Sequence, residues 1–258
     1  MPTLNDRALS LARGIAVRAG RFLRERRSLR ISFKSGVGNL VTDMDRASEE
    51  RILRAIRKEF PGHAIVAEES GRHAGEEGRW FVDPLDGTTN YAHGLPLYAV
   101  SIGFEWKGKM EVGVVYHPEL DDLWWARRGE GAFRNRDRLR ISKTSRLDRA
   151  MLCTGFPYAM KPKIANLKFF STFVRRARAV RRLGAASLDL CFTAAGIYDG
   201  FWESRLGPWD IAAGLLLCRE AGAVATDYAG KSTDLFTGEL VVANRAIHGQ
   251  MLAVLRRA

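Results

Sequence analysis

Residues 80–90 read Trp-Phe-Val-Asp-Pro-Leu-Asp-Gly-Thr-Thr-Asn, and this stretch decides the fold. Its first three residues are an apolar run, which predicts a buried strand. We expect the strand to end at Asp83, because Pro84 has no N–H to donate to a sheet ladder. Gly87 and Thr88 then predict a tight turn into a helix, whose first N–H groups are unpaired and suit an anion.

The carboxylates of Asp83 and Asp86 come three positions apart at this strand end. Neighbouring carboxylates repel each other unless a cation lies between them, and oxygen ligands select a hard ion such as Mg²⁺. The stretch therefore predicts a metal-bridged phosphate site. The alternative is a simple acidic turn, because Asp, Pro and Gly are common turn residues for local reasons.

A second acidic pair follows a second short strand. Residues 64–67 predict a buried strand, and Glu68 and Glu69 come directly after it. Two strand ends would thus deliver carboxylates to one rim, which favours at least one of these glutamates as a ligand over a surface charge. Asp210 is expected in the first turn of a helix over residues 209–221, where an acidic side chain is often only favourable for the helix dipole.

Three segments together resemble the signatures of the inositol monophosphatase family: Asp83-Pro-Leu-Asp-Gly-Thr-Thr-Asn90, Val66-Ala-Glu-Glu-Ser70 and Trp209-Asp-Ile-Ala-Ala-Gly214. The resemblance runs from the first helix to the last and is closest to the bacterial inositol-1-monophosphatases. It implies a layered α/β fold, the αβαβα five-layer sandwich of the sugar phosphatase type. It also implies one domain over residues 1–258, with a metal and catalytic half over about 1–145 and a substrate half over about 146–258.

The resemblance implies a ligand set for two or three Mg²⁺ ions per active site. Glu68, Asp83 and the Leu85 carbonyl would hold one ion. Asp83, Asp86 and Asp210 would hold a second.

The catalytic residues that it implies are Asp45, Thr88 and Glu68. The Thr88 hydroxyl, paired with Asp45, would accept and orient the proton of the attacking water. Lys34 occupies the position of a family lysine on a loop that helps to close the site.

Substrate contacts are implied for two turns and two acidic side chains: Gly87, Thr88, Gly184, Ala185, Ala186, Glu203 and Asp210. Gly184 enters a helix expected over residues 185–195, so its neighbouring N–H groups suit substrate oxygens. Relatives commonly have Ser or Thr directly after this glycine. Here Ala185 stands there, with Ser187 two places on, so a hydroxyl contact is lost or replaced.

The implied reaction is Mg²⁺-dependent hydrolysis of a small polyol phosphate monoester, with myo-inositol 1-phosphate as the expected substrate. Fructose 1,6-bisphosphate, histidinol phosphate and a 3′-phosphoadenosine nucleotide remain alternatives, because one carboxylate and a few N–H groups recognise any vicinal polyol phosphate. A homodimer and sensitivity to Li⁺ are also implied. The alternative from another class is a regulator on the same fold that associates with RNA or RNA polymerase, for which the net charge of +12 is the motive.

Bulk composition limits the other function classes. The chain has 258 residues and 46% hydrophobic content, enough for a sizeable core, and no apolar run approaches the ~18 residues that span a bilayer. Three widely spaced cysteines with no Cys-x-x-Cys pair predict buried, reduced thiols in a cytoplasmic protein. Basic residues cluster at 24–30, 127–140 and 175–182. None of these clusters interleaves with aromatics in a known RNA-binding pattern, so we expect solvated basic faces.

Periodicity predicts the remaining elements. Helices are expected over residues 4–23, after a cap at Thr42 or Asp43, and over 161–176 and 245–257. Strands are expected over 98–106, 110–116, 123–126, 179–183, 199–203, 223–226 and 240–243.

Overall fold

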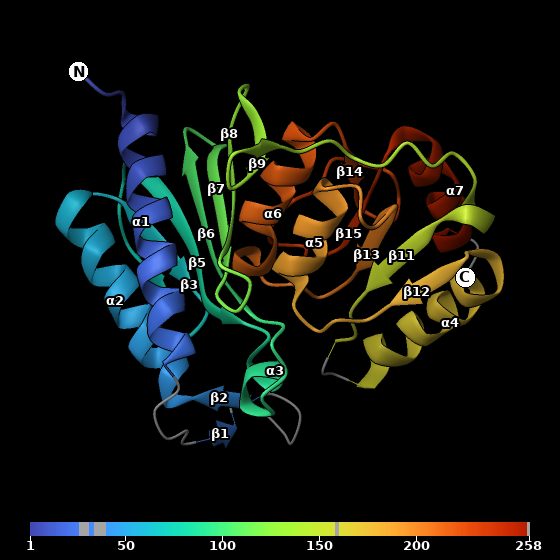
Figure 1. Cartoon of the computed structure of the whole chain (residues 1–258), viewed down its shortest axis with the longest axis horizontal. Coiled ribbons are helices and arrows are strands. Elements are labelled where there is room, and N and C mark those ends of the chain that lie inside the picture. The colour runs from blue at the N-terminus through green and yellow to red at the C-terminus, as the bar shows by residue number, and fades with distance from the viewer. Residues whose placement is uncertain (26–30, 34–39, 158–159, 257–258) are drawn as a thin grey trace.

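The structure, a computed structural model, describes residues 1–25, 31–33, 40–157 and 160–256. Its elements form five layers (Figure 1). In order these are α1 (Leu4–Arg24) with α2 (Asp43–Glu59), an eight-stranded sheet, α5 (Ala186–Ala194) with α6 (Pro208–Glu220), a five-stranded sheet, and α4 (Met160–Arg176) with α7 (Arg245–Leu255). The predicted αβαβα sandwich is confirmed.

The larger sheet has the strand order β10-β9-β8-β7-β6-β5-β3-β4. Its strands are β3 (Ala64–Ala67), β4 (Gly71–His73), β5 (Gly78–Asp86), β6 (Ala99–Trp106), β7 (Lys109–His117), β8 (Asp122–Arg127), β9 (Gly131–Arg134) and β10 (Asp137–Arg138). All pairs are antiparallel except β3 with β5, which is parallel. The carboxyl ends of β3 and β5 therefore lie at the same edge, as the two acidic pairs predict.

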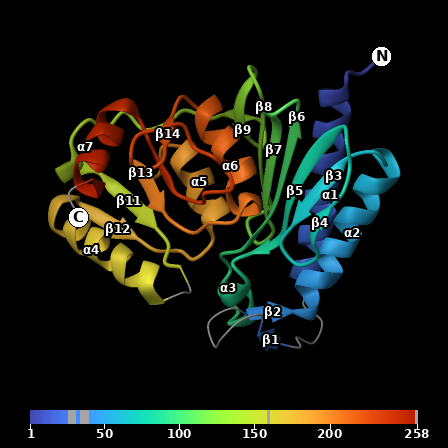
Figure 2. The same ribbon diagram turned by 180° about the vertical axis from the view of Figure 1, so that it is seen from behind.

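The smaller sheet has the order β12-β11-β13-β15-β14. Its strands are β11 (Met151–Thr154), β12 (Ala179–Arg181), β13 (Gly200–Glu203), β14 (Val224–Thr226) and β15 (Leu240–Ala243). A third, two-stranded sheet of β1 (Ile31–Phe33) and β2 (Leu40–Thr42) lies beside the short helix α3 (Thr88–Ala92), below the two large sheets (Figure 2). The 3₁₀ turn η1 (Leu147–Arg149) precedes β11.

The expectation that the strand of residues 80–82 ends at Asp83 is wrong, because β5 continues to Asp86. Its pairing with β6 is interrupted after Asp83 and resumes at Asp86, which lies opposite Ala99. Pro84 has no N–H to give, and the Leu85 N–H donates to Asp83 Oδ1 at 2.9 Å instead of to the neighbouring strand. The result is an irregularity of the kind that re-aims side chains at functional edges.

The other expected strands and helices are present, with ends that differ by at most two residues. The apolar run of β5 is explained by burial on both faces, since Trp80 and Val82 pack under α1 and α2 while Phe81 packs toward α5 and α6. The three cysteines are buried and unpaired. No helix within the described residues is both long and apolar enough to cross a bilayer.

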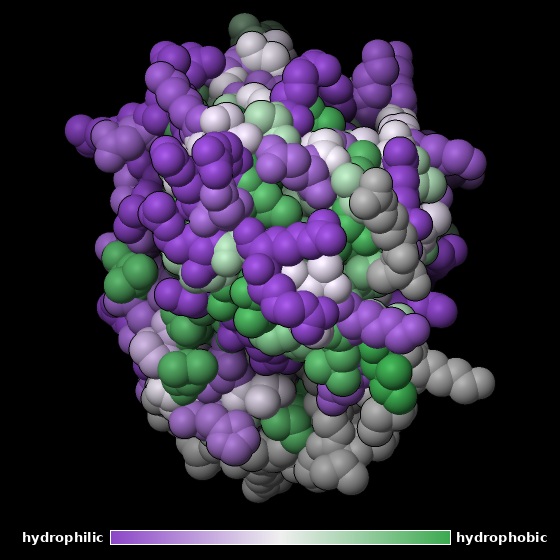
Figure 3. Space-filling view, turned by 90° about the vertical axis from the view of Figure 1, so that its right-hand side faces the viewer, coloured by the Kyte–Doolittle hydropathy of each residue, from purple (hydrophilic) through white to green (hydrophobic). Residues whose placement is uncertain are grey.

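The face formed by α4 and α7 is mostly hydrophilic, with apolar side chains in small groups (Figure 3). Arg175, Arg176 and Arg178 of the third basic cluster are exposed. Helix α4, which carries Arg175 and Arg176, also exposes Ile164 and Val174.

A pair of glycines lets α6 approach the centre of the larger sheet. Gly103 of β6 and Gly113 of β7 lie opposite each other across the ladder. A Cβ added at Gly113 would lie 2.6 Å from the Ala213 carbonyl oxygen, and one at Gly103 would lie 2.9 Å from the Ala212 Cβ. Only glycine therefore permits this close packing of α6 on β6 and β7.

Replacing Gly113 should consequently destabilise the fold. We expect Gly113→Ala to lower the free energy of unfolding by about 1–3 kcal/mol, because the new methyl group would displace helix backbone. The matched control is Gly249→Ala in α7, where an added Cβ meets nothing within 4 Å. That change should be neutral or stabilising by about 0.5–1 kcal/mol. Thermal melts of both variants make the comparison, and equal stability of Gly113→Ala and the wild type would contradict the close packing.

Candidate functional site

Four carboxylates meet where β3 and β5 end and α6 begins. Glu68 follows β3, Asp83 and Asp86 belong to β5, and Asp210 lies in the first turn of α6. Asp83 is only 1% exposed. Its pKa is raised well above the usual range by burial first, then by the charges of Glu68, Asp86 and Asp210, and by a hydrogen bond with Glu68. The predicted metal-ligating side chains are thus brought together.

Burial also raises the pKa of the two other aspartates of this group. Burial and the charges of Glu68 and Asp86 raise the pKa of Asp210 well above its usual range, although the Gly207 N–H donates to it. Burial raises the pKa of Asp86 to about 6, and hydrogen bonds from Ser187 offset part of this effect. Protonation or a cation would relieve the repulsion, and a cation would allow all of these groups to be charged.

The donor set fits a hard divalent ion, since every candidate ligand is an oxygen. Among the described residues, no group of three or more His, Cys, Asp or Glu side chains has an arrangement that could hold a metal ion. Mg²⁺ characteristically keeps waters and shares substrate phosphate oxygens with one or two carboxylates. An open rim of carboxylates is therefore suited to a metal that also binds substrate.

The predicted pair of Thr88 and Asp45 is present. Thr88 Oγ1 donates to Asp45 Oδ1 at 2.9 Å and lies 3.1 Å from the Leu85 carbonyl oxygen. The other carboxylate oxygen of Asp45 accepts the N–H and the hydroxyl of Thr42, at 2.7 and 2.5 Å. Thr42 is also the N-cap of α2, which decides between the two caps expected there. Asp45 is therefore held rigidly by the helix cap.

The environment of Asp45 suits a proton acceptor. Burial raises its pKa, while the hydrogen bonds from Thr42 and Thr88 lower it and the charge of Glu68 raises it further. A carboxylate with a raised pKa holds a proton more readily than a solvated one.

The turn at Gly87 depends on glycine. Its φ is 90°, and a Cβ there would lie 2.8 Å from the Leu97 carbonyl oxygen. Gly87 is the N-cap of α3, so the predicted helix start is confirmed, although the helix is only five residues long.

The start of α5 is held by Asp86. Ala185 occupies the N-cap position and has no side chain that can cap. Instead, Asp86 Oδ2 accepts the Ser187 N–H at 2.7 Å and the Ser187 hydroxyl at 2.5 Å. Ser187 thus supplies a hydroxyl two residues after Ala185, and its partner is a carboxylate of the rim. Sequence reasoning missed this contact, for which the only signal was Ala at the capping position.

The turn before α5 is tied to α3 by Asn90. Its amide donates to the Leu97 carbonyl at 2.7 Å and to the Leu183 carbonyl at 2.9 Å. Gly184 follows with φ of 86°. Asn90 therefore holds Gly184, Ala185 and Ala186 beside the turn of Gly87.

Glu203 ends β13 and packs against Gly155, where a Cβ would lie 2.1 Å from Glu203 Oε1. Burial and the charge of Asp86 raise the pKa of Glu203 to about 8, while Arg182 and the Gly155 N–H lower it. Burial therefore favours the protonated form of Glu203 at neutral pH. Of the other residues named from sequence, Lys34 lies outside the described part of the chain.

Comparisons with known proteins agree with these features. The model of the inositol monophosphatase family matches residues 4–258. An inositol-1-monophosphatase of Mesorhizobium japonicum is 42% identical over 249 residues, which cover 94% of this chain and 93% of that protein. The Nus factor SuhB of Escherichia coli K12 is 43% identical over 226 residues, 86% of this chain and 85% of that protein.

A solved structure shares the fold over almost the whole chain. The crystal structure of extragenic suppressor protein suhB from Bartonella henselae matches with a TM-score of 0.93 and 37% identity, covering 98% of this chain and 99% of that one. Family match, relatives and fold all span both halves of the candidate site. The chain therefore belongs to the inositol monophosphatase family.

Proposed function

We propose that this protein is a Mg²⁺-dependent phosphatase that hydrolyses a small polyol phosphate monoester, with myo-inositol 1-phosphate as the substrate. Family membership supports a phosphatase. The observation that carries the proposal is the rim of four buried or half-buried carboxylates beside the hydrogen-bonded pair of Thr88 and Asp45.

When bound, Mg²⁺ at Glu68, Asp83 and the Leu85 carbonyl, and at Asp83, Asp86 and Asp210, would acidify the attacking water and neutralise charge on the phosphoryl group. The Thr88 hydroxyl donates its hydrogen bond to Asp45. The lone pairs of Thr88 Oγ1 therefore remain free to accept a hydrogen bond from the attacking water. Asp45, whose pKa burial raises, is the acceptor at the end of this relay.

Substrate orientation falls to backbone N–H groups and to Glu203. The N–H groups of Gly87 and Thr88 would bind phosphate oxygens, and those of Gly184, Ala185 and Ala186 the oxygens nearer the polyol. A Glu203 carboxyl with a pKa of about 8 can donate as well as accept, which suits vicinal hydroxyls. These groups would also fit the alternative substrates, fructose 1,6-bisphosphate, histidinol phosphate and 3′-phosphoadenosine nucleotides.

A regulator on the same fold that associates with RNA or RNA polymerase is the second candidate. The +12 net charge and the similarity to proteins named Nus factor SuhB favour it. Salt-dependent RNA binding that persists after removal of the metal ligands would support this role. We further propose a cytoplasmic homodimer and inhibition by Li⁺, which follow the family resemblance.

Phosphate release from a substrate panel tests the proposal. The panel comprises myo-inositol 1-phosphate and the three alternative substrates, each with Mg²⁺ and with EDTA. We expect myo-inositol 1-phosphate to give the highest kcat/KM, with the activity lost in EDTA. Full activity in EDTA would overturn the metal-dependent reaction, and a higher kcat/KM for another substrate would reassign the specificity.

The relay predicts a selective loss of turnover at Thr88. Thr88→Ala should lower kcat by roughly 10², the scale of losing a general base, with little change in the thermal shift that Mg²⁺ induces. Thr88→Ser keeps the hydroxyl and is the matched control, for which we expect turnover close to that of the wild type. A loss of about tenfold or less in Thr88→Ala would leave the residue a structural role only.

Burial of Glu203 predicts a dependence of stability on pH. Its pKa is about 8 in the fold against 4.5 ordinarily, so between these values the native state binds the proton more tightly than the unfolded state. Stability from this group is fully present below the lower value and is lost as pH rises through the higher one. Glu203→Gln, which mimics the protonated form, removes this dependence.

Melting temperatures of wild type and Glu203→Gln measured from about pH 5 to about pH 9 check this prediction. The wild type should lose stability relative to the variant as pH rises. Parallel curves over this range would show that Glu203 is not held protonated by burial.

A further inference from the structure

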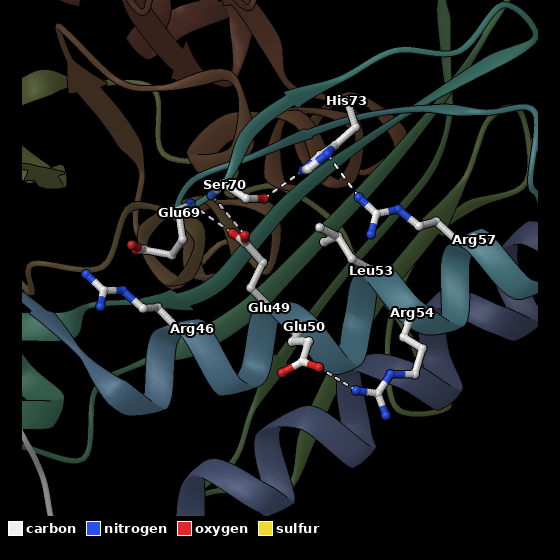
Figure 4. A pocket seen from close by; sticks show the side chains of 9 residues that line it. All are labelled: Arg46, Glu49, Glu50, Leu53, Arg54, Arg57, Glu69, Ser70 and His73. Carbon is white, nitrogen blue, oxygen red and sulfur yellow. Dashed lines mark hydrogen bonds and ion pairs between the residues drawn. The ribbon is translucent and has the colours of Figure 1, made fainter.

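Both oxygens of the Glu49 carboxylate accept hydrogen bonds from the backbone that follows Glu68. Glu49 belongs to α2 and is only 3% exposed. Its Oε2 accepts the Glu69 N–H at 2.8 Å and its Oε1 accepts the Ser70 N–H at 2.9 Å (Figure 4). The two oxygens thus accept hydrogen bonds from two consecutive N–H groups of one turn. Because one rigid carboxylate binds both, the positions of the two N–H groups are coupled.

That turn carries Glu68 at its start. Ala67 and Gly71 are cross-strand partners, so residues 68–70 connect β3 to β4. The Glu68 N–H donates to the Val82 carbonyl at 3.1 Å, next to Asp83. The Glu68 backbone is therefore fixed by β5 on one side and by Glu49 on the other.

The same face of α2 contacts the other parts of the rim. Asp45, Ser48 and Glu49 stand at positions i, i+3 and i+4, which share one side of a helix. Asp45 accepts the Thr88 hydroxyl, and the Ser48 hydroxyl donates to the Pro84 carbonyl at 3.0 Å. One helix face thus sets the relative positions of the turn after Glu68, the irregular segment of β5 and Thr88.

We infer that Glu49 is a positioning residue, which fixes the Glu68 carboxylate in the orientation that binds Mg²⁺. The inference rests on the proposed function of the rim. Glu49 acts through the Glu69 and Ser70 N–H groups, in the way that outer hydrogen bonds orient a metal ligand.

Glu49 lines a groove in which other ionisable side chains contact one another. This groove has a volume of about 530 Å³ and lies between α2 and the start of β4 (Figure 4). Arg54 pairs with Glu50 at 2.5 Å, and Arg57 contacts His73 Nδ1 at 2.9 Å. These side chains of the groove therefore contact one another, whereas the Glu49 carboxylate accepts hydrogen bonds from backbone N–H groups.

Ser70 in this groove is not an activated nucleophile. Arg57 has only donors, so His73 Nδ1 must accept and the ring proton lies on Nε2. The Nε2–H then donates to Ser70 Oγ at 2.7 Å, the reverse of the arrangement that removes a serine proton. The polar groups here therefore support structure around the turn.

Two substitutions separate positioning from charge. Glu49→Gln keeps the length of the side chain but turns an amide donor toward one of the two N–H groups. Glu49→Asp keeps the charge but is one methylene too short to reach both. Glu50→Gln is the matched control, because Glu50 is the adjacent, exposed residue of the same groove and pairs only with Arg54 among the contacts drawn in Figure 4.

The measurement is the Mg²⁺ affinity of the metal-free full chain, determined by titration calorimetry without substrate. The titration is run at a temperature below the melting temperature that each variant shows in EDTA, so that the protein is folded before Mg²⁺ is added. We expect both Glu49 variants to bind Mg²⁺ at least about tenfold more weakly than the wild type, and Glu50→Gln to bind normally. In phosphate-release assays the Mg²⁺ concentration for half activation should rise, while KM for substrate at saturating Mg²⁺ should stay close to that of the wild type.

The outcomes are distinct. Unchanged Mg²⁺ affinity in both Glu49 variants would overturn the inference. Normal Mg²⁺ affinity in Glu49→Asp alone would show that Glu49 acts through its charge and not by positioning Glu68. Absence of Mg²⁺ binding by the wild type would instead overturn the proposed function.

A second measurement, amide hydrogen exchange, uses the wild type alone. The Glu69 and Ser70 amides should exchange slowly, and rapid exchange would show that Glu49 does not hold the turn.

Discussion

Repulsion among Glu68, Asp83, Asp86 and Asp210 is the constraint on which the rest of the site depends. Burial and mutual charge raise the pKa values of the three aspartates, so their charged forms need compensation. Part of it comes from the backbone. Each of these aspartates accepts an N–H, from Leu85, Ser187 and Gly207 respectively. Hydrogen bonds to the charged form favour it, but they leave the repulsion in place, and a bound cation would remove it.

Contacts near these carboxylates also join the eight-stranded sheet to the helices α5 and α6. Asp86 caps α5 through Ser187, Asn90 ties the Leu97 and Leu183 carbonyls together, and α6 packs closely on β6 and β7 over Gly103 and Gly113. The proposed phosphate-binding turn at Gly87 and the polyol-binding Glu203 are therefore fixed relative to one rigid junction. This arrangement suits a reaction in which positioning and charge neutralisation carry most of the catalysis.

Local patterns predicted most strands and helices and the acidic pairs at two strand ends, because an apolar run followed by acidic residues marks a strand end whatever the strand pairs with. The five-layer sandwich and the roles of Asp45, Thr88 and Glu203 came from the resemblance to the family. The continuation of β5 past Pro84 was not predictable, since it depends on Ala99 in the neighbouring strand. The partner of Asp86 was missed because Ser187 lies 101 positions away. Glu49 gave no signal either: its role requires knowing which turn faces α2, and in sequence it is one of several acidic residues of an amphipathic helix.

The most direct test of the electrostatic account is a pair of thermal melts of Asp210→Asn, in EDTA and in Mg²⁺. Asn can still accept the Gly207 N–H that Asp210 accepts at 2.6 Å, so the helix cap survives while one charge is removed. Asp148→Asn, at an exposed pair with Arg146, is the control for the change in net charge. The account predicts an unchanged or higher melting temperature for Asp210→Asn in EDTA and a smaller stabilisation by Mg²⁺ than in the wild type. A lower melting temperature in EDTA together with an undiminished Mg²⁺ shift would contradict it.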